Sequence, residues 1–369
     1  MKVAYFLGAL NRGGMETLLL DILSRANTAS YQIVCIYREE GVISDAFKAT
    51  GVPLFKMTPR RGIDLSYILR LRRLLCREKV DIVHAQHSLE ACYAWLATRG
   101  CGIKIIQTFH GYDYHQTAKG RFFMKWMIRH ADLNIFVSEV QKSYYEKKYH
   151  FPPNRSQVVY NGIDFAKFEQ QGRGETFESP GLLIGSVGNF VPGRDQITIC
   201  RFLVLLKKTG IPFRFLFAGR RDSRYPHLYD ECVRFCETEG LQEEVCFLGT
   251  RSDVPSLLAQ WDAFIYSTEH DTFGIAVIEA IAAGIPVFVN DWEVMREVTE
   301  EGRLAVLYKT REIERLLSSF LDFYAHPEEY REKAQKAALH IKEKYGIEKH
   351  MEELSKRYAY LLGTGNKTC

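Results

Sequence analysis

The feature that most constrains the fold is the alternation of short apolar runs with amphipathic helical stretches along the whole chain of 369 residues. The runs are rich in β-branched and aromatic residues, and most are predominantly apolar without alternation of apolar and polar residues. Runs of this kind predict parallel strands that helices cover on both faces. We expect strands at 2–8, 32–37, 81–85, 103–109, 133–138, 157–162, 182–188, 213–219, 245–249, 263–267, 285–290 and 304–308. Helical periods occupy 15–25, 63–79, 196–208, 327–345 and 347–362.

This number of strands is too large for one doubly wound sheet. A polar, glycine-containing stretch at Glu169–Gly181 separates the halves and is the natural linker. We therefore predict two Rossmann-like, doubly wound parallel-sheet domains that face a central cleft. Their expected bounds are 1–174 and 175–346, with a C-terminal helix at about 347–369 packing back on the first domain. A single eight-stranded barrel is the competing architecture, and the break near residue 175 weighs against it.

Charge is unevenly distributed between the halves. The chain has a net charge of +4, but residues 1–174 hold 25 Lys and Arg against 15 Asp and Glu, or +10. The remainder holds 24 against 30, or −6. This asymmetry suggests an anionic partner for the first half, and chance scatter of surface charge is the alternative. Nucleic acid is a poor candidate for that partner, because no recognition module is visible.

The cysteines and the N-terminus bear on localisation. Nine cysteines stand at irregular spacings without a CxxC pair, a pattern that indicates reduced thiols in a cytosolic protein and argues against a zinc site. The opening "MKVAYFLGALNRGG" lacks a small-residue cleavage site and predicts a first strand instead of a signal peptide. We expect a cytoplasmic protein.

Polar residues follow several of the predicted strands, where ligands bind in parallel α/β sheets. Gly13 and Gly14 precede a helix whose N–H groups can approach a phosphate, although GxGxxG spacing is absent. His110 can hydrogen-bond a sugar hydroxyl or stabilise developing charge. Arg194 opens a helix and can clamp a diphosphate. Each residue also has an ordinary explanation, as a turn, a packing histidine or a surface arginine.

The stretch "EHDTFGIAVIEAIAAGIPVFVN" (residues 269–290) is nearly all apolar but carries Asp271 and Glu279. A membrane span is a poor explanation, because Glu279 falls in its middle and "AGIPV" interrupts the helix. A helix from about 275 to 283 after a polar turn fits better. The N–H groups of Phe273, Gly274 and Ile275 can then hold phosphate or sugar oxygens. A buried Glu279 carboxylate needs partners, and two ribose hydroxyls suit it.

These motifs resemble the retaining GT-B glycosyltransferases of family four, and the resemblance is collinear over nearly the whole chain. Asp271, the "TFG" turn, Glu279 and "AAGIPV" resemble the family's E-x7-E region. The other matching motifs are "GGMET", "DIVHAQ", "TFHG", "FVSE", "VVYNGID" (Val158–Asp164), "VPGRDQ" and "FLGTRSDVPSLLAQWDAFIYS". The chain looks like the bacterial enzymes that build exopolysaccharide, capsule or lipopolysaccharide.

The resemblance implies a role for each site residue. Glu279 would bind the nucleotide ribose, Asp271 the donor sugar, and the turn at 273–275 the sugar and phosphate. Arg194 matches the family's diphosphate-gripping lysine, and His110 matches its histidine beside the donor sugar. Gly14 matches the loop where acceptor and diphosphate meet. We therefore expect His110, Asp271 and Arg194 to be catalytic. The implied reaction moves a sugar with retention from a UDP-sugar or GDP-sugar, with no further cofactor and no metal ion.

Two departures from the family pattern concern the donor. Asp271 is shorter than the usual Glu, so the sugar contact would be reached differently. Asn189 stands where many members have an arginine, which leaves Arg194 with less help at the diphosphate. Arg220 and Arg221 are the candidates to compensate.

Two stretches of the first half are basic and amphipathic. In residues 119–130, Phe122, Phe123, Trp126 and Met127 are expected to share one helical face, and in 65–79 leucines recur at helical spacing. Basic residues accompany both stretches: Lys119, Arg121, Lys125, Arg129, Arg70, Arg72, Arg73, Arg77 and Lys79. Such helices can lie on an anionic membrane and present a lipid-linked saccharide acceptor, which predicts a peripheral protein at the inner face of the cytoplasmic membrane. The alternative is two ordinary helices packed on the sheet.

Two other functions stay open at this stage. A sugar-nucleotide epimerase could use the same scaffold, but it would need acid and base residues and no acceptor. A protein that binds sugar nucleotides with little catalysis is suggested by Asp271 and Asn189.

Overall fold

The computed structural model describes residues 1–11, 13–60, 64–114, 117–151, 153–169 and 175–364. The chain divides into two compact units, which are described separately. Unit 1 comprises Met1–Ile163 and the chain from Ile347 onward, and unit 2 is Asp164–Gly346. The predicted linker at 169–181 and the predicted boundary at 174 lie partly outside the described residues.

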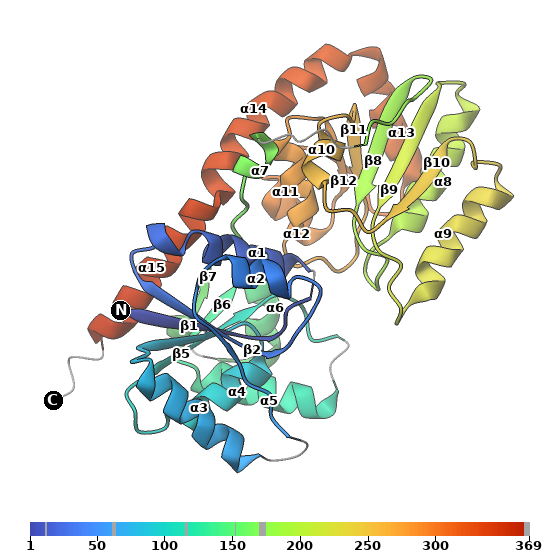
Figure 1. Ribbon diagram of the computed structural model, residues 1–369. Coiled ribbons are helices and arrows are strands. Elements are labelled where there is room, and N and C mark those ends of the chain that lie inside the picture. The colour runs from blue at the N-terminus through green and yellow to red at the C-terminus, as the bar shows by residue number, and fades with distance from the viewer. Residues whose placement is uncertain (12, 61–63, 115–116, 152, 170–174, 365–369) are drawn as a thin grey trace. The chain divides into compact units, whose positions relative to one another are not determined.

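Unit 1 contains a parallel sheet of seven strands in the order β3-β2-β1-β4-β5-β6-β7 (Figure 1). The strands are β1 (Lys2–Ala9), β2 (Gln32–Glu39), β3 (Leu54–Lys56), β4 (Ile82–Ala85), β5 (Lys104–Phe109), β6 (Leu133–Phe136) and β7 (Ser156–Val158). The helices are α1 (Gly14–Ser24), α2 (Ser44–Ala49), α3 (Leu65–Arg77), α4 (Ser88–Thr98), α5 (Ala118–His130), α6 (Glu139–Tyr149) and α15 (Ile347–Thr364), with short 3₁₀ turns at Ala26–Thr28 and Pro153–Arg155.

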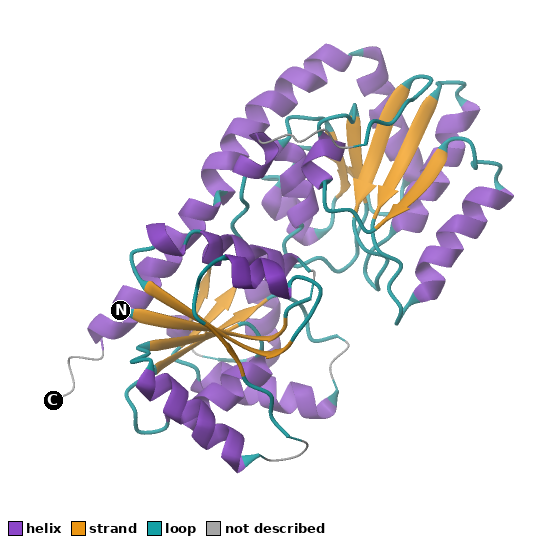
Figure 2. Cartoon of the chain, viewed as in Figure 1, coloured by secondary structure: helices purple, strands orange, loops and turns teal. Residues whose placement is uncertain are grey.

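Helices cover both faces of the unit 1 sheet (Figure 2). The central strand β1 shows why, because successive side chains point to opposite faces and nearly all of them are apolar. Val3, Tyr5 and Leu7 belong to a core with residues of α1, α2 and α15, while Ala4 and Phe6 belong to a second core with α3, α4 and α5. A strand buried on both faces reads as one continuous apolar run, as the sequence does here.

The C-terminal helix α15 is part of the unit 1 core. Its apolar stripe of Ile347, Met351, Leu354, Tyr358 and Leu361 packs in the same cluster as β1 and α1. The chain needs a glycine where it meets this helix, because a Cβ on residue 162 would lie 2.7 Å from the His350 Cβ and 2.9 Å from the Ile347 Cα. The "YNG" sequence therefore serves the close approach of α15.

Unit 2 contains a parallel sheet of six strands in the order β10-β9-β8-β11-β12-β13. The strands are β8 (Leu182–Val187), β9 (Phe213–Ala218), β10 (Val245–Gly249), β11 (Ala263–Tyr266), β12 (Val287–Asn290) and β13 (Val306–Tyr308). The helices are α7 (Ala166–Glu169), α8 (Gln196–Lys208), α9 (Pro226–Thr238), α10 (Val254–Leu258), α11 (Ile275–Ala282), α12 (Glu293–Val298), α13 (Ile313–Ala325) and α14 (Pro327–Tyr345).

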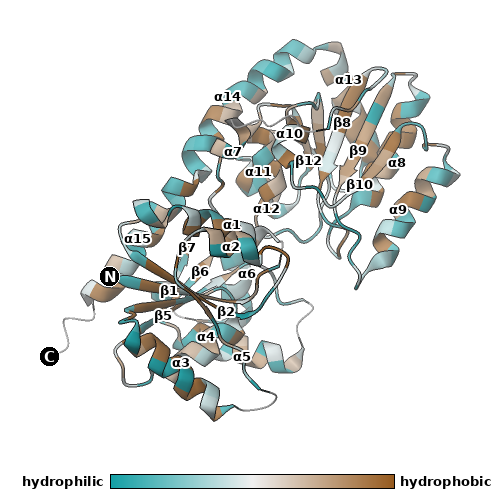
Figure 3. Cartoon of the chain, viewed as in Figure 1, coloured by the Kyte–Doolittle hydropathy of each residue, from teal (hydrophilic) through white to brown (hydrophobic). Residues whose placement is uncertain are grey.

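The main core of unit 2 joins its strands to α8, α9 and α13, and it is rich in phenylalanine. Rings of Phe202 and Phe288 both pack against Phe320 of α13, at centroid distances of 5.5 and 5.4 Å. Figure 3 shows mainly hydrophilic colour along α14, which packs on α11. The helices thus bury one stripe and expose another, as expected for a doubly wound fold.

Each of the twelve predicted runs contains a strand, and the prediction of two doubly wound parallel sheets is confirmed. One strand was missed. β3 (Leu54–Lys56) is an edge strand of only three residues that pairs with β2, and none of its side chains is fully buried. The predicted strand at 157–162 is wrong beyond Val158, because the chain there turns toward α15.

Candidate active site

The order of the strands identifies one edge in each sheet where a ligand would bind. In unit 1 the order reverses between β1 and β4, and in unit 2 between β8 and β11. In open α/β sheets, ligands bind outside the carboxyl ends of the strands at such a switch point. The loops after β1 and β5 carry Gly13, Gly14 and His110, and the loops after β8 and β11 carry Arg194 and Asp271.

In unit 2 the structure brings Arg194 and Asp271 together as an ion pair between Nη1 and Oδ2. The Tyr266 hydroxyl donates to the same carboxylate oxygen at 2.7 Å. The Arg194 guanidinium also lies over the Tyr266 ring, 5.3 Å from its centroid. From the sequence, these two charged residues were expected to contact different parts of the donor, and their pairing was not predicted.

Both members of this pair are ionised. Burial alone would raise the pKa of Asp271, but the charge of Arg194 and the Tyr266 hydroxyl hold that pKa below its ordinary value. Burial disfavours the charged form of Arg194, but Asp271 outweighs this effect and raises the pKa of Arg194. The Arg194 side chain is 26% exposed and that of Asp271 only 8%, so the cation is the more accessible partner for a ligand.

The loops that carry this pair are tied together by the backbone. Residues 194 and 268 form an antiparallel bridge, and the Thr268 hydroxyl donates to the Gly193 carbonyl at 2.9 Å. Asn290, at the end of β12, is fully buried and holds Thr268 from both sides, accepting from its N–H at 3.0 Å and donating to its carbonyl at 2.8 Å. The sequence analysis missed Asn290 as a supporting residue, although a polar residue that ends an apolar strand is a recognisable signal.

The turn before α11 is built by glycine. Gly274 has a φ of +81°, and a Cβ there would lie 2.6 Å from the Met295 Cε, so other residues are strained at this position. The Asp271 carboxylate accepts from the Thr272 N–H at 2.9 Å, which shapes the turn. Phe273 is buried, and α11 begins at Ile275 without a side-chain cap, so its first N–H groups point out of the helix end.

Glu279 lies in α11 and is half-buried, whereas Ile278, Ala280 and Ile281 around it are buried. The sequence analysis treated Glu279 as a buried carboxylate, and this description is too strong. α11 is only eight residues long. Within the described ranges, no helix has the length and apolar character that a bilayer span requires.

In unit 1, Gly13 and Gly14 begin α1. Gly13 is the N-cap with extended backbone, and its carbonyl accepts from the Thr17 N–H at 3.0 Å. Glu16 stands in the first turn, where burial raises its pKa above the ordinary value. An acidic residue in the first turn suits the positive end of the helix dipole.

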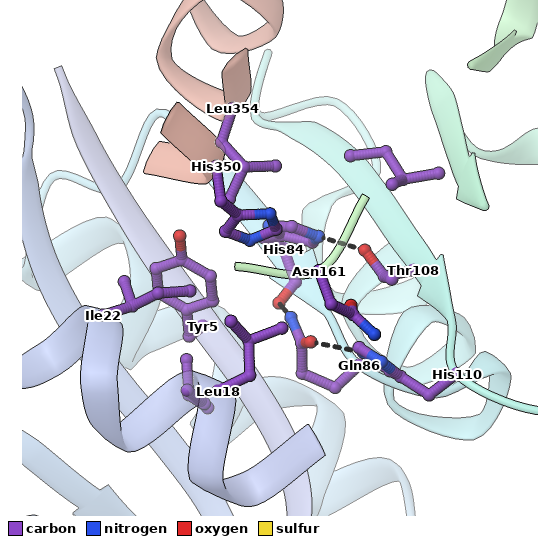
Figure 4. A pocket seen from close by; sticks show the side chains of 12 residues that line it. Tyr5, Leu18, Ile22, His84, Gln86, Thr108, His110, Asn161, His350 and Leu354 are labelled. Atoms are coloured by element: carbon purple, nitrogen blue, oxygen red, sulfur yellow. Dashed lines mark hydrogen bonds between the residues drawn. The ribbon is translucent and has the colours of Figure 1, made fainter. Parts of the chain in front are cut away.

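His110 follows β5 and contacts Gln86, which follows β4 (Figure 4). The His110 Nε2 lies 2.9 Å from the Gln86 Oε1. Both residues line a small cavity of about 10 Å³ inside unit 1. Its other polar side chains come from five different elements or loops: Tyr5, His84, Thr108, Asn161 and His350. The Asn161 Oδ1 is buried and has no hydrogen-bond partner among the described residues.

The loop after His110 is held by the aromatic helix α6. The Gly111 carbonyl accepts from the Gln141 Nε2 at 3.1 Å and from the Tyr145 hydroxyl at 3.0 Å. Asp113 is buried and accepts from the hydroxyls of Tyr144 and Tyr149 and from the Lys148 ammonium. These contacts fix the backbone on the carboxyl-end side of His110.

Asn189, which stands where many family members have an arginine, and the two neighbouring arginines Arg220 and Arg221 all have hydrogen-bond partners within unit 2. The Asn189 Oδ1 accepts from the Arg220 N–H at 3.0 Å. The side chain of Arg220 pairs with Asp222 at 3.1 Å, and that of Arg221 forms two bonds of 2.7 Å with Asp230. A diphosphate would have to compete with these carboxylates for either arginine. Among the described residues, no group of three or more His, Cys, Asp or Glu could hold a metal ion.

Two parallel-sheet α/β units, each with polar loops at its switch point, are the architecture of the GT-B glycosyltransferases. Residues 12–167 match the model of Glycosyltransferase Family 4, and residues 168–340 match that of Glycosyl transferases group 1. The chain therefore belongs to the family-four glycosyltransferases, and it is an enzyme of that kind.

Relatives with assigned names include glycosyltransferases that act on lipid-linked saccharides. The chain is 22% identical over 302 residues to UDP-Gal:alpha-D-GlcNAc-diphosphoundecaprenol alpha-1,3-galactosyltransferase of Escherichia coli, covering 75% of this chain and 76% of that one. It is 24% identical over 320 residues to GDP-mannose:cellobiosyl-diphosphopolyprenol alpha-mannosyltransferase of Xanthomonas campestris, covering 81% and 80%. The fold is shared with a glycosyltransferase of Rickettsia africae ESF-5, with a TM-score of 0.84, 18% identity and coverage of 99% of both chains. Anabaena Alr3699/HepE in complex with UDP is similar at a TM-score of 0.83 and 15% identity, covering 98% and 100%.

Proposed function

We propose that this enzyme transfers a sugar with retention from a UDP-sugar or GDP-sugar to a lipid-linked saccharide in the synthesis of a bacterial surface polysaccharide. The observation that carries the donor part is the cluster of Arg194, Asp271 and the Gly274 turn at the switch point of unit 2. A cation and uncapped N–H groups at one strand edge suit a diphosphate.

In this proposal each group has a separate task. Arg194 and the N–H groups at the start of α11 stabilise the negative charge that grows on the diphosphate as the anomeric bond breaks. Arg194 turns from Asp271 toward the diphosphate, and Asp271 then contacts the sugar. Glu279 accepts the ribose hydroxyls. His110 contacts a hydroxyl of the donor sugar. The departing phosphate helps to remove the proton of the acceptor hydroxyl, and no metal ion takes part.

The lipid-linked acceptor is supported by the relatives. Two of them carry diphosphoundecaprenol or diphosphopolyprenol in the names of their acceptors, and both names specify an alpha product. A polyprenyl diphosphate stays in the membrane, so an enzyme that uses it must reach the bilayer surface. This requirement points to a membrane-facing surface on the chain.

The outer surface of α3, α4 and α5 supplies such a surface, which we call the basic helical face. α4 packs against both of the other helices, and the rings of Trp95 and Trp126 join α4 to α5 at a centroid distance of 5.9 Å. Large apolar side chains are exposed along it: Leu65 by 71%, Leu69 by 53%, Leu96 by 45%, Phe122 by 62% and Trp126 by 40%. The sequence analysis placed Met127 on the same face as Phe122, and this is wrong because Met127 is fully buried.

The basic helical face is mainly positive, and acids at the two ends of α3 pair with two of its arginines, Asp64 with Arg70 at 3.8 Å and Glu78 with Arg77 at 3.1 Å. α3 and α5 contain no Asp or Glu, and the single acid of α4, Glu90, is buried and paired with Arg38 at 2.7 Å. Arg72 is engaged, donating to the Arg99 carbonyl at 2.8 Å. The exposed basic residues are Arg70, Arg73, Arg77, Arg99, Lys119, Arg121, Lys125 and Arg129. Exposed apolar side chains within a mainly cationic surface fit an anionic bilayer, to which each unpaired basic residue near the surface contributes about 1 kcal/mol.

The donor proposal is tested by thermal shift with a panel of sugar nucleotides, followed by a transfer assay with the stabilising donor. Glu279→Gln should weaken binding of that nucleotide by roughly tenfold or more, because an amide accepts two hydroxyls less well than a carboxylate. Glu314→Gln, on the exposed side of α13, is the matched control and should bind normally. Unchanged affinity in Glu279→Gln would refute the ribose contact.

The transfer assay separates the other functions. Free nucleoside diphosphate that appears only when an acceptor is present supports transfer. A changed sugar nucleotide without acceptor would indicate an epimerase. Tight binding without turnover on any acceptor would indicate a protein that only binds sugar nucleotides.

A further inference from the structure

A chain of contacts leads from the backbone carbonyl of His84 through the Gln86 side chain to a ring nitrogen of His110. Gln86 stands between β4 and His110 (Figure 4). Its Nε2 lies 3.3 Å from the backbone carbonyl of His84, and its Oε1 lies 2.9 Å from the His110 Nε2. Gln86 is 5% exposed, so water does not compete freely for these contacts.

The hydrogen-bond roles follow from the chemistry of the groups. A backbone carbonyl only accepts, so the amide nitrogen of Gln86 must face His84 and the amide oxygen must face His110. An amide oxygen also only accepts, so the His110 Nε2 must be the donor. A neutral imidazole has one N–H, and its other nitrogen, Nδ1, then carries the lone pair.

Both ring nitrogens of His84 have hydrogen-bond partners, so the His84 carbonyl that contacts Gln86 has a fixed position. The His84 Nδ1 lies 2.6 Å from the Tyr358 hydroxyl of α15, and its Nε2 lies 2.6 Å from the Thr108 hydroxyl of β5. The Tyr358 hydroxyl also lies 3.0 Å from that of Tyr5 in β1. The orientation of Gln86 is thus tied to the core of unit 1.

We propose that Gln86 is a positioning residue that holds His110 as the tautomer protonated on Nε2, so that Nδ1 is the ring nitrogen able to accept a hydrogen bond from a hydroxyl of the donor sugar. The inference rests on the proposed function, in which His110 contacts that sugar. The proposed tautomer also restricts which donor sugars the enzyme would accept. An acceptor nitrogen favours a sugar that presents a hydroxyl at this point, and it disfavours one that presents a carboxylate there.

The surroundings of His110 keep it neutral. The titratable groups that face it are His84 on β4, His87 before α4 and His350 on α15. Burial lowers the pKa of His110 well below its ordinary value, and these three histidines lower it further. A carboxylate in place of the Gln86 amide would act in the opposite direction, because a negative charge favours the imidazolium.

The first test is the tautomer itself. Long-range ¹H–¹⁵N correlation spectra of the full-length enzyme, with the His110 signals assigned from a His110→Gln variant, should show the proton on Nε2. In Gln86→Met, which keeps the volume but removes the acceptor, the population with the proton on Nδ1 should rise. A wild-type His110 protonated on Nδ1, or an unchanged tautomer in Gln86→Met, would overturn the proposal. These spectra need no substrate, so they decide the tautomer even if the proposed transfer reaction fails.

The second test separates positioning from general support of the fold. Gln86→Met should lower kcat by roughly tenfold at every pH. Gln86→Glu keeps an acceptor and should retain more activity near pH 8, but its kcat should fall toward low pH as His110 becomes protonated. Parallel pH profiles of Gln86→Glu and wild type would contradict the proposal. Gln32→Glu, an exposed position at the start of β2, is the matched control and should leave the profile unchanged.

Discussion

At the scale of single residues, the main finding is that Arg194 and Asp271 neutralise each other. A donor diphosphate would replace Asp271 as the partner of Arg194, which leaves the carboxylate for the sugar. The shorter side chain of Asp, compared with the usual Glu, fits this arrangement, because Asp271 is held back against Tyr266. In the proposed function, the pair links the two departures from the family pattern: fewer cations at the diphosphate, and a carboxylate that stays paired with Arg194 until the donor binds.

We predict that Arg194 and Asp271 are energetically coupled. Arg194→Met leaves a buried carboxylate without its counter-charge and should cost about 3–5 kcal/mol of unfolding free energy. Adding Asp271→Asn should recover part of that loss, with a coupling energy of about 1–3 kcal/mol. Urea titrations of the wild type, the two single variants and the double variant give the four unfolding free energies from which the coupling energy is calculated.

The matched control is the pair of Arg221 and Asp230, whose side chains are 49% and 42% exposed. A cycle on this exposed pair should give a coupling energy below about 1 kcal/mol. Additive effects at Arg194 and Asp271 would mean that the pair seen in the structure contributes nothing to stability.

At the scale of elements, helix α15 is attached to unit 1 through both apolar and polar contacts. Its Tyr358 reaches His84, and the Nδ1 of its His350 donates to the Tyr160 carbonyl at 2.6 Å. Burial lowers the pKa of His84 to about 3 and that of His350 to about 4. Both histidines are neutral in the folded protein, and protonation of either one opposes the docking of α15.

We predict that α15 opens more readily in acid. The ordinary histidine pKa is about 6.5, so the unfolded state binds more protons than the folded state below that pH. Docking of α15 is therefore most stable above about pH 6.5. As the pH falls from about 6 to 4, each of the two histidines lowers the opening free energy of α15 by up to about 1.4 kcal/mol per pH unit. Hydrogen exchange of α15 amides, corrected for the intrinsic rate, measures the opening free energy.

His350→Gln should reduce the pH slope of that opening, because one titrating group is gone. His227→Gln, at an exposed position in α9, should leave the slope unchanged. The same slope in wild type and His350→Gln would exclude His350 as a source of the acid sensitivity.

At the scale of the whole molecule, the cationic half of the sequence is the half that carries the basic helical face. We predict that the enzyme floats with vesicles that contain about one-third anionic lipid and does so less at high salt, because screening weakens the attraction. A variant with Leu69, Phe122 and Trp126 changed to Gln should lose most of this binding.

Leu339→Gln is the matched control, because this leucine is 69% exposed on α14 of unit 2. It should float as the wild type does. Binding that does not depend on salt, or that survives in the variant of the basic helical face, would remove this surface as the membrane contact.

Much of the fold follows from local patterns in the sequence. Apolar runs such as 2–8 and 263–267 contain strands, and α8 spans 196–208 as its period predicts. The glycines at 162 and 274, and the motifs around Asp271 and Glu279, are also visible without coordinates. The sequence pattern predicts the strands because most of them are buried on both faces, so their residues are mainly apolar and can be recognised without knowledge of the rest of the fold.

Other features exist only because distant segments meet. Arg194 and Asp271 are 77 residues apart, Gln86 and His110 are 24 apart, and Tyr358 and His84 are 274 apart. Strand order and register bring these pairs together, and neither is encoded in any one segment. The sequence by itself determined the kinds of elements, the family and the candidate residues. The tertiary structure decided which of those residues form ion pairs and hydrogen bonds with one another, because these interactions depend on distances between side chains that only packing sets.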